Sequence, residues 1–266
     1  RDRSHTMSPM TPRGPVAERQ WYEIRAAAAS PDVTEVFIYD FIGIDWWSGE
    51  GVGAKQFAEA VRAIETPQIH LHLNSPGGSV FDGVAIHNAL VRHPANVTTF
   101  IDGLAASIAS VIALAGSRVV MAANALFMIH NPWGAIRGTA ADMRQYADTL
   151  DKIRDTLVVT YQERTGMSVE DLIAALDAET WFTAEEALAA GFIDEIGVEL
   201  AAAAHFDLAA LGYRNPPGSP APAAGPAAAD PTTSTPGGAP VADASGGAPE
   251  HSSTETWVPG LGYVKF

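Results

Sequence analysis

The stretch Gln68-Ile-His-Leu-His-Leu-Asn-Ser-Pro-Gly-Gly-Ser-Val80 joins an apolar alternation to a glycine turn and then to the start of a helical pattern. The alternation predicts a strand over residues 68–73, with Ile69, Leu71 and Leu73 on one face. Pro-Gly-Gly interrupts it, and the following residues 80–91 predict a helix that ends before Pro94. A strand, a tight turn and a helix in this order are typical of an α/β fold.

The same order continues on both sides of this stretch. Further strands are predicted over residues 36–42, 97–101, 118–121 and 126–129, and helices over residues 54–64, 105–115, 139–164, 169–176 and 184–190. Regular alternation of strands and helices predicts a mostly parallel sheet.

Charge and composition exclude several classes of function. The chain has 266 residues, 47% of them hydrophobic, and a formal charge of −15. Nucleic acids and anionic membranes both require a basic face, so we expect neither as a partner. The absence of cysteine excludes disulfides and a cysteine nucleophile, and fits a reducing compartment. No apolar stretch reaches the roughly 20 residues of a spanning helix, and residues 1–13 contain no apolar secretory segment. We expect a cytoplasmic protein.

Composition divides the chain into four parts. Residues 1–30 are expected to form an N-terminal segment that is partly disordered, and residues 31–214 the folded domain. Residues 215–253 are rich in proline, alanine and glycine, which predicts a disordered linker. Residues 254–266 regain aromatic side chains, and they are either a docking peptide for a partner or a loosely attached terminus.

Two small-residue turns are candidates for chemistry. The backbone amides of Gly77 and Gly78 could form an oxyanion site, although Pro-Gly-Gly is also an ordinary strand–helix turn. In Asp102-Gly-Leu-Ala-Ala-Ser-Ile-Ala-Ser-Val111, Ser107 is predicted to lie one turn into a helix. Ser107 is there either a nucleophile near the helix N-terminus or a packing residue among small neighbours.

A nucleophilic serine requires a base and a group that orients the base. His130 directly follows the apolar strand of residues 126–129, and the carboxyl ends of strands are where α/β sheets place their sites. It is therefore the strongest candidate among the eight histidines. The acidic residues of Leu176-Asp-Ala-Glu-Thr-Trp-Phe-Thr183 are candidates for the orienting group.

Four motifs in one order resemble the ClpP peptidase family over about residues 36–196. They are Asn74-Ser-Pro-Gly-Gly78, Gly103-Leu-Ala-Ala-Ser-Ile-Ala109, Met128-Ile-His-Asn-Pro132 and Phe182-Thr-Ala-Glu-Glu-Ala187 followed by Gly191-Phe-Ile-Asp194. Two features are most similar to the ClpP-like head maturation proteases of tailed phages and prophages. One is the sequence Asp177-Ala-Glu-Thr-Trp181, and the other is the lack of an obvious N-terminal segment for docking an ATPase. The resemblance implies an α/β fold of the ClpP/crotonase-like type, with superhelical ββα repeats and a projecting handle helix.

The resemblance also implies roles for individual residues. Ser107 would be the nucleophile and His130 the general base. Aligning Trp181-Phe-Thr-Ala184 on the family's segment places Glu179 where the family has an aspartate, with Asp177 as the rival. The backbone amides of Gly77, or Gly78, and of Ile108 would bind the oxyanion. No metal and no organic cofactor is implied, and the peptidase itself needs no ATP.

The remaining implications concern partners. The helix from Thr139 matches the family's handle, which implies a homo-oligomeric ring, and residues 133–138 match the segment that pairs with extended peptide substrate. Substrates would be proteins or peptides, and the similarity to phage proteases implies capsid or scaffold proteins in the cytoplasm of a bacterial host. Two alternatives remain: a catalytically silent assembly or scaffolding protein of the same fold, and a crotonase-type acyl-CoA enzyme.

Overall fold

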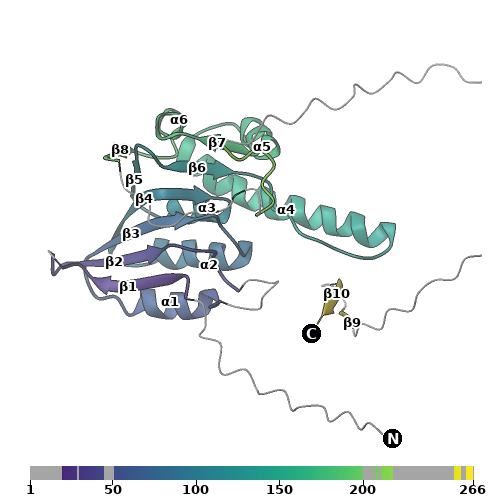
Figure 1. The fold of residues 1–266 in the computed structure, drawn as a ribbon, viewed down its shortest axis with the longest axis horizontal. Helices are drawn as coiled ribbons and strands as arrows, with labels where there is room; N and C mark the ends of the chain where they lie inside the picture. Colours follow the sequence, from purple (N-terminus) through teal and green to yellow (C-terminus); the bar gives the residue numbers. More distant parts are fainter. Residues whose placement is uncertain are drawn as a thin grey trace, which may run out of the picture.

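The computed structural model of the chain describes residues 20–28, 30–44, 51–199, 206, 208, 211–217, 255–258 and 262–265. Most of the predicted linker, residues 218–253, and most of the predicted N-terminal segment, residues 1–19, lie outside the described residues. The described core is a mixed α/β domain, as predicted (Figure 1).

A twisted sheet forms the centre of the domain, and eight of its strands lie in the described part of the chain. They are β1 (Tyr22–Ala26), β2 (Val33–Ile38), β3 (Gln68–Ser75), β4 (Asn96–Ala106), β5 (Arg118–Ala122), β6 (Leu126–Ile129), β7 (Thr180–Phe182) and β8 (Glu195–Gly197). The main path runs β1-β2-β3-β4-β5-β8. It is parallel from β2 to β8, and β1 joins β2 antiparallel.

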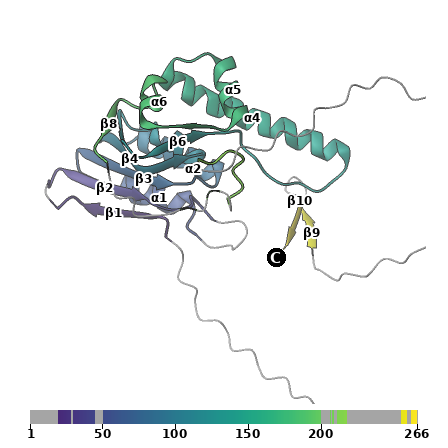
Figure 2. The ribbon, with the colours of Figure 1, turned by 45° about the horizontal axis from the view of Figure 1, so that its top comes forward.

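Helices pack along the sheet (Figures 1 and 2). They are α1 (Ala54–Arg62), α2 (Val80–Val91), α3 (Ile108–Ala113), α4 (Ala140–Thr165), α5 (Val169–Ala178) and α6 (Ala184–Ala189). The predicted inward face of β3 is confirmed, because Ile69, Leu71 and Leu73 are fully buried. Helices α2 and α3 approach closely at Gly83, where an added Cβ would lie 2.1 Å from Ile108 Cγ1.

Strand β4 is longer than predicted and divides the sheet. Its first half, Thr98 to Ile101, pairs with β5, whereas Leu104 to Ala106 pair with β6. The sequence had assigned residues 105–106 to a helix, since small residues such as Gly103 and Ala105 carry little strand preference. Pairing with β6 outweighs that local preference, and α3 begins only at Ile108.

Helix α4 extends away from the body of the domain (Figures 1 and 2). A capping box between Thr139 and Asp142 begins it, and Gly166 ends it in the left-handed conformation. Its buried residues, Leu157, Val158 and Tyr161, all lie in the second half. Apolar residues of the first half are therefore uncovered within one chain, and Met143 is 50% exposed.

Strand β1 and two strands near the C-terminus were not predicted from the sequence. Strand β1 falls within the segment of residues 1–30 that was expected to precede the domain, yet it pairs with β2 along its whole length. Near the C-terminus, β9 (Glu255–Val258) pairs antiparallel with β10 (Gly262–Lys265), within the predicted aromatic peptide.

Candidate active site

Ser107 lies in a strained turn between β4 and α3, and not one turn into a helix as predicted. Its φ of 55° and ψ of −129° are unusual for a residue with a side chain. The amide of Ser107 donates to the carbonyl of Met128 at 3.1 Å, and the carbonyl of Ser107 accepts a hydrogen bond of 2.5 Å from the Ser110 hydroxyl. A serine on a sharp strand-to-helix turn, held with its hydroxyl outward, is the geometry of a nucleophile elbow.

Two glycines allow the neighbouring turn to approach this elbow. At Gly77, with φ +98°, an added Cβ would lie 2.7 Å from the Cβ of Ser107. At Gly78, with φ +150°, it would lie 2.2 Å from the carbonyl oxygen of Ile42. The sequence suggested either an oxyanion site or an ordinary strand–helix turn at these glycines. In the structure, close packing of the chain on itself also demands both glycines.

His130 follows β6 and reaches Ser107 across the divided sheet. Its Nε2 lies 2.8 Å from Ser107 Oγ, although 23 positions separate the two residues. Strand register explains this contact, because β6 runs parallel to the end of β4 and pairs Met128 with Ala106. The residues that follow these two strands therefore emerge at the same edge of the sheet.

Burial and two charges set the basicity of His130. Burial lowers the pKa of its imidazole, the charge of Glu179 acts in the opposite direction, and the charge of Arg214 lowers the pKa further. The net direction is downward, so the ring is mainly neutral near pH 7. A neutral imidazole is the form that can accept a proton from a serine hydroxyl.

Glu179 is the acid that the structure brings to His130. Strand β7 is antiparallel to β6 and pairs Thr180 with Ile129, so the residue before β7 lies beside the residue after β6. Glu179 is 4% exposed and has a φ of +52°. Its carboxylate accepts hydrogen bonds from the amides of Arg214 and Asn215, at 2.9 and 2.7 Å, and from the Trp181 indole at 3.3 Å.

Glu179 and His130 interact through charge. Among the described residues, no hydrogen bond joins the carboxylate to the imidazole. The rival acid, Asp177, accepts a hydrogen bond of 2.6 Å from the Asn131 side chain, in an exposed position. Of the two acids, Glu179 is therefore the one that is buried and acts on the imidazole.

The oxyanion site differs in part from the sequence-based expectation. The amide of Gly77 donates to the Ser75 hydroxyl at 3.1 Å, so Gly77 is not a free donor in this geometry. Ser75 in turn donates to the carbonyl of Asp40 at 2.6 Å, which fixes the orientation of the turn. Gly78, which lines the cavity beside Ser107, and Ile108 remain the candidate backbone donors.

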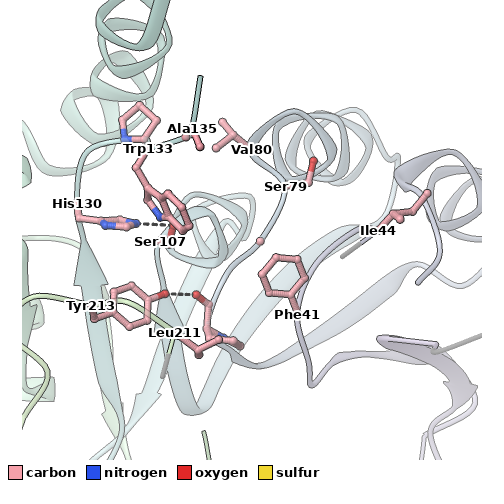
Figure 3. A pocket seen from close by; sticks show the side chains of 14 residues that line it. Phe41, Ile44, Ser79, Val80, Ser107, His130, Trp133, Ala135, Leu211 and Tyr213 are labelled. Carbon is pink, nitrogen blue, oxygen red and sulfur yellow. Dashed lines mark hydrogen bonds between the residues drawn. The ribbon is translucent and has the colours of Figure 1, made fainter. Parts of the chain in front are cut away.

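A cavity of about 600 Å³ contains the serine and the histidine (Figure 3). Residues 131–137, which have no regular secondary structure, form one side, and Trp133 is 64% exposed there. Aromatic and aliphatic side chains dominate the rest of the lining. The lining residues are Phe41, Ile44, Pro76, Gly78, Ser79, Val80, Ser107, His130, Pro132, Trp133, Gly134, Ala135, Leu211 and Tyr213.

Sequence reasoning missed one part of the site, residues 211–217. Leu211 and Tyr213 line the cavity, and Arg214 and Asn215 contact Glu179. The composition change at residue 215 had placed a domain boundary there. The available signal was an aromatic residue followed by Arg-Asn at the edge of an otherwise featureless segment.

Within the described ranges, no group of three or more histidines and acidic residues could hold a metal ion. None of the helices in that part of the chain is long and apolar enough to cross a bilayer.

Comparisons with known proteins place the chain among relatives of one family. A family model described as Clp protease matches residues 54–199. A Clp protease proteolytic subunit 2 of Mycolicibacterium paratuberculosis is 38% identical over 49% of this chain and 67% of its own length. A subunit 2 of Thermobifida fusca is 42% identical over 48% of the chain and 64% of its own. A Clp subunit of Streptococcus pneumoniae is 41% identical over 49% and 69%. The chain thus spans about two thirds of the length of these relatives.

Proposed function

Because the chain belongs to the Clp protease family, we propose that it is a serine endopeptidase. The observation that carries this proposal is the 2.8 Å contact between Ser107 Oγ and His130 Nε2 at the wall of an open cavity. A hydroxyl next to a mainly neutral imidazole is a nucleophile next to its base. The same pair argues against the acyl-CoA alternative, which needs no serine nucleophile.

The first half of the reaction is acyl transfer to the serine. His130 Nε2 takes the proton of Ser107 Oγ as Oγ attacks the carbonyl carbon of the scissile peptide bond. Negative charge develops on the carbonyl oxygen, where the amides of Gly78 and Ile108 are placed to donate. The imidazolium then gives its proton to the leaving nitrogen, and the carbon–nitrogen bond breaks.

The second half returns the serine. A water molecule gives one proton to His130 and attacks the acyl ester, and the ester bond to Oγ breaks as the imidazolium reprotonates Ser107. Glu179 stabilises the imidazolium in both halves through its charge. No step consumes ATP, so a requirement for ATP would arise from a separate unfolding partner.

The surfaces around the site suggest how substrate and subunits bind. Residues 133–135 run unpaired along the cavity and can pair with an extended peptide through the backbone, which tolerates many sequences. The exposed first half of α4, including Met143, supports assembly of several copies, since its apolar residues are uncovered within one chain. A homo-oligomeric ring in the cytoplasm is part of the proposal.

We further propose phage head precursor proteins, such as capsid or scaffold, as the substrate class. Support comes from glutamate at position 179 within Asp177-Ala-Glu-Thr-Trp181, which resembles the phage head proteases more than the aspartate pattern of the wider family. Co-expression with a phage capsid protein, followed by mass spectrometry, tests this assignment. Defined capsid fragments that disappear with Ser107→Ala are expected. An intact capsid beside an enzyme that cleaves other peptides would contradict only the substrate class.

Hydrolysis of a fluorogenic peptide with apolar side chains tests the peptidase function itself. Ser107→Ala and His130→Ala are expected to lower kcat by a factor of about 10³ or more. His87→Ala is the control, because His87 is also partly buried but lies on α2, outside the cavity that contains Ser107. A folded wild-type oligomer without Ser107-dependent hydrolysis would contradict the proposal.

A further inference from the structure

A short C-terminal segment, residues 211–217, crosses the candidate active site; we call it the strap. It lies beyond residues 54–199, which the family model matches. It touches three separate parts of the site: the turn before Gly77, the imidazole of His130 and the carboxylate of Glu179. Figure 3 shows the ring of Tyr213 beside His130 at the edge of the cavity.

Tyr213 is the anchor of the strap. Its ring lies 5.5 Å from the imidazole of His130 and 5.4 Å from the indole of Trp181, measured between centroids. Its hydroxyl donates to the carbonyl of Pro76, a contact between positions 137 apart in the chain. Burial, and then the charge of Glu179, raise the pKa of the phenol, so the hydroxyl remains a donor at neutral pH. The hydrogen bond to Pro76 thus holds the Tyr213 ring in place against the imidazole of His130.

The backbone after Tyr213 holds the acid. Among the described residues, the Glu179 carboxylate accepts three hydrogen bonds, and two of them come from the amides of Arg214 and Asn215. The Arg214 guanidinium adds an ion pair at 3.8 Å. Burying a carboxylate costs free energy unless hydrogen bonds and nearby cations replace its lost hydration. Without the strap, Glu179 would keep only the indole contact of Trp181.

We propose that the strap is a positioning element of the active site: Tyr213 fixes the imidazole of His130, and the amides of Arg214 and Asn215 hold the Glu179 carboxylate beside it. This inference rests on the proposed peptidase function. It assigns part of the catalytic arrangement to residues outside the family-matched region.

A blocking role fits the geometry less well. With the strap in place, Ser107 Oγ and His130 Nε2 remain 2.8 Å apart. The cavity of about 600 Å³ stays open, with Leu211 and Tyr213 as part of its wall. A segment that silenced the enzyme would be expected to separate the pair or to fill the cavity.

Substitution at Asn215 isolates the contact with the acid. Asn215→Pro removes the backbone N–H that donates a hydrogen bond to the Glu179 carboxylate. Asn215→Ala keeps that N–H and removes only the hydrogen bond from the side chain to the carbonyl of Ala178. We expect the proline variant to lose about 10- to 100-fold in kcat with little change in KM. The alanine variant should retain most of the wild-type kcat. Equal activity of the two folded variants, or a gain in activity for Asn215→Pro, would overturn the inference.

A second pair of variants applies if the proline variant does not fold. Tyr213→Phe keeps the ring against His130 and removes only the hydroxyl, whereas Tyr213→Leu keeps apolar volume and removes the ring. We expect kcat to decrease from wild type to Tyr213→Phe and further to Tyr213→Leu. The rate of Ser107 acylation by a fluorophosphonate should follow the same order. Wild-type values for folded Tyr213→Leu would overturn the inference.

The wild-type measurement separates the two possible failures. If wild type neither hydrolyses the peptide nor reacts with the fluorophosphonate, the proposed peptidase function fails. If wild type is active and the strap variants match it, the peptidase function stands and the positioning role of the strap fails.

Discussion

The hydroxyl of Ser110 donates to the carbonyl oxygen of Ser107 at 2.5 Å, and the buried hydroxyl of Tyr161 lies 2.7 Å from the same Ser110 oxygen. Since Ser110 uses its proton for Ser107, Tyr161 is the donor in the second bond. Tyr161, near the C-terminal end of α4, thus supports the carbonyl of Ser107 through Ser110. The backbone conformation of Ser107 is itself unfavourable. Such support is what a strained turn needs in order to persist.

The first prediction concerns this support. Ser110→Ala leaves the Tyr161 hydroxyl buried without its partner, and should lower the free energy of unfolding by about 1–3 kcal/mol. Urea denaturation measures the loss. Adding Tyr161→Phe removes the orphaned hydroxyl as well, so the double variant should regain part of the stability. A single variant as stable as wild type would contradict this account.

The second prediction concerns Gly77. Gly77→Ala places a methyl group 2.7 Å from the Ser107 Cβ, at a φ of +98° that alanine disfavours. We expect peptide hydrolysis to fall by about 10²-fold, the loss that a displacement of a reacting group by about 1 Å can cause. Gly53→Ala is the matched control, since nothing lies within 4 Å of its added Cβ. Comparable activity in the two variants would count against close packing of the turn on Ser107.

The third prediction is a pH dependence. Hydrolysis requires neutral His130, so kcat/KM rises as pH increases through the pKa of the imidazole. Arg214→Gln removes a charge that lowers this pKa, and should move the rise to higher pH. Glu179→Gln removes a charge that raises it, and should move the rise to lower pH as well as reducing the rate. Shifts in the opposite directions would show that these charges do not act on His130.

The fourth prediction distinguishes the two acids. Glu179→Asp withdraws the carboxylate by one methylene from the amides of Arg214 and Asn215, and is expected to lower kcat by about tenfold or more. Asp177→Asn changes an exposed contact with Asn131 and should cost far less. Measuring kcat for peptide hydrolysis with both variants shows which carboxylate acts on His130. A larger loss from Asp177→Asn would make Asp177 the acid that acts on His130.

Local patterns predicted most of the fold. Strand β6 and helix α2 have the predicted ends, because a β-rich apolar run and a capped helix each carry their own boundaries. Strand β4 was predicted too short, since its last residues are small and only pairing with β6 makes them a strand. Strand β1 was missed although Tyr22-Glu-Ile-Arg-Ala26 alternates apolar and polar residues, because residues 1–30 were assigned as a whole to the N-terminal segment.

The site was less predictable than the fold. The resemblance of four motifs to the ClpP family singled out Ser107 and His130, and the structure brings them together. The positive φ of Ser107 was hidden, since small residues around it favour a helix locally. The amide of Gly77 donates to the Ser75 hydroxyl, and this contact depends on a side-chain rotamer that the sequence does not reveal. The strap depends on contacts as far as 137 positions apart, which no local pattern encodes.

The most direct test of a serine nucleophile paired with His130 is the mass of the protein after exposure to a fluorophosphonate. We predict one adduct per chain, located on Ser107 by peptide mapping, absent from Ser107→Ala, and formed far more slowly in His130→Ala. His87→Ala should react as wild type does. A folded, assembled protein that acquires no adduct, or acquires it on another serine, would contradict the account.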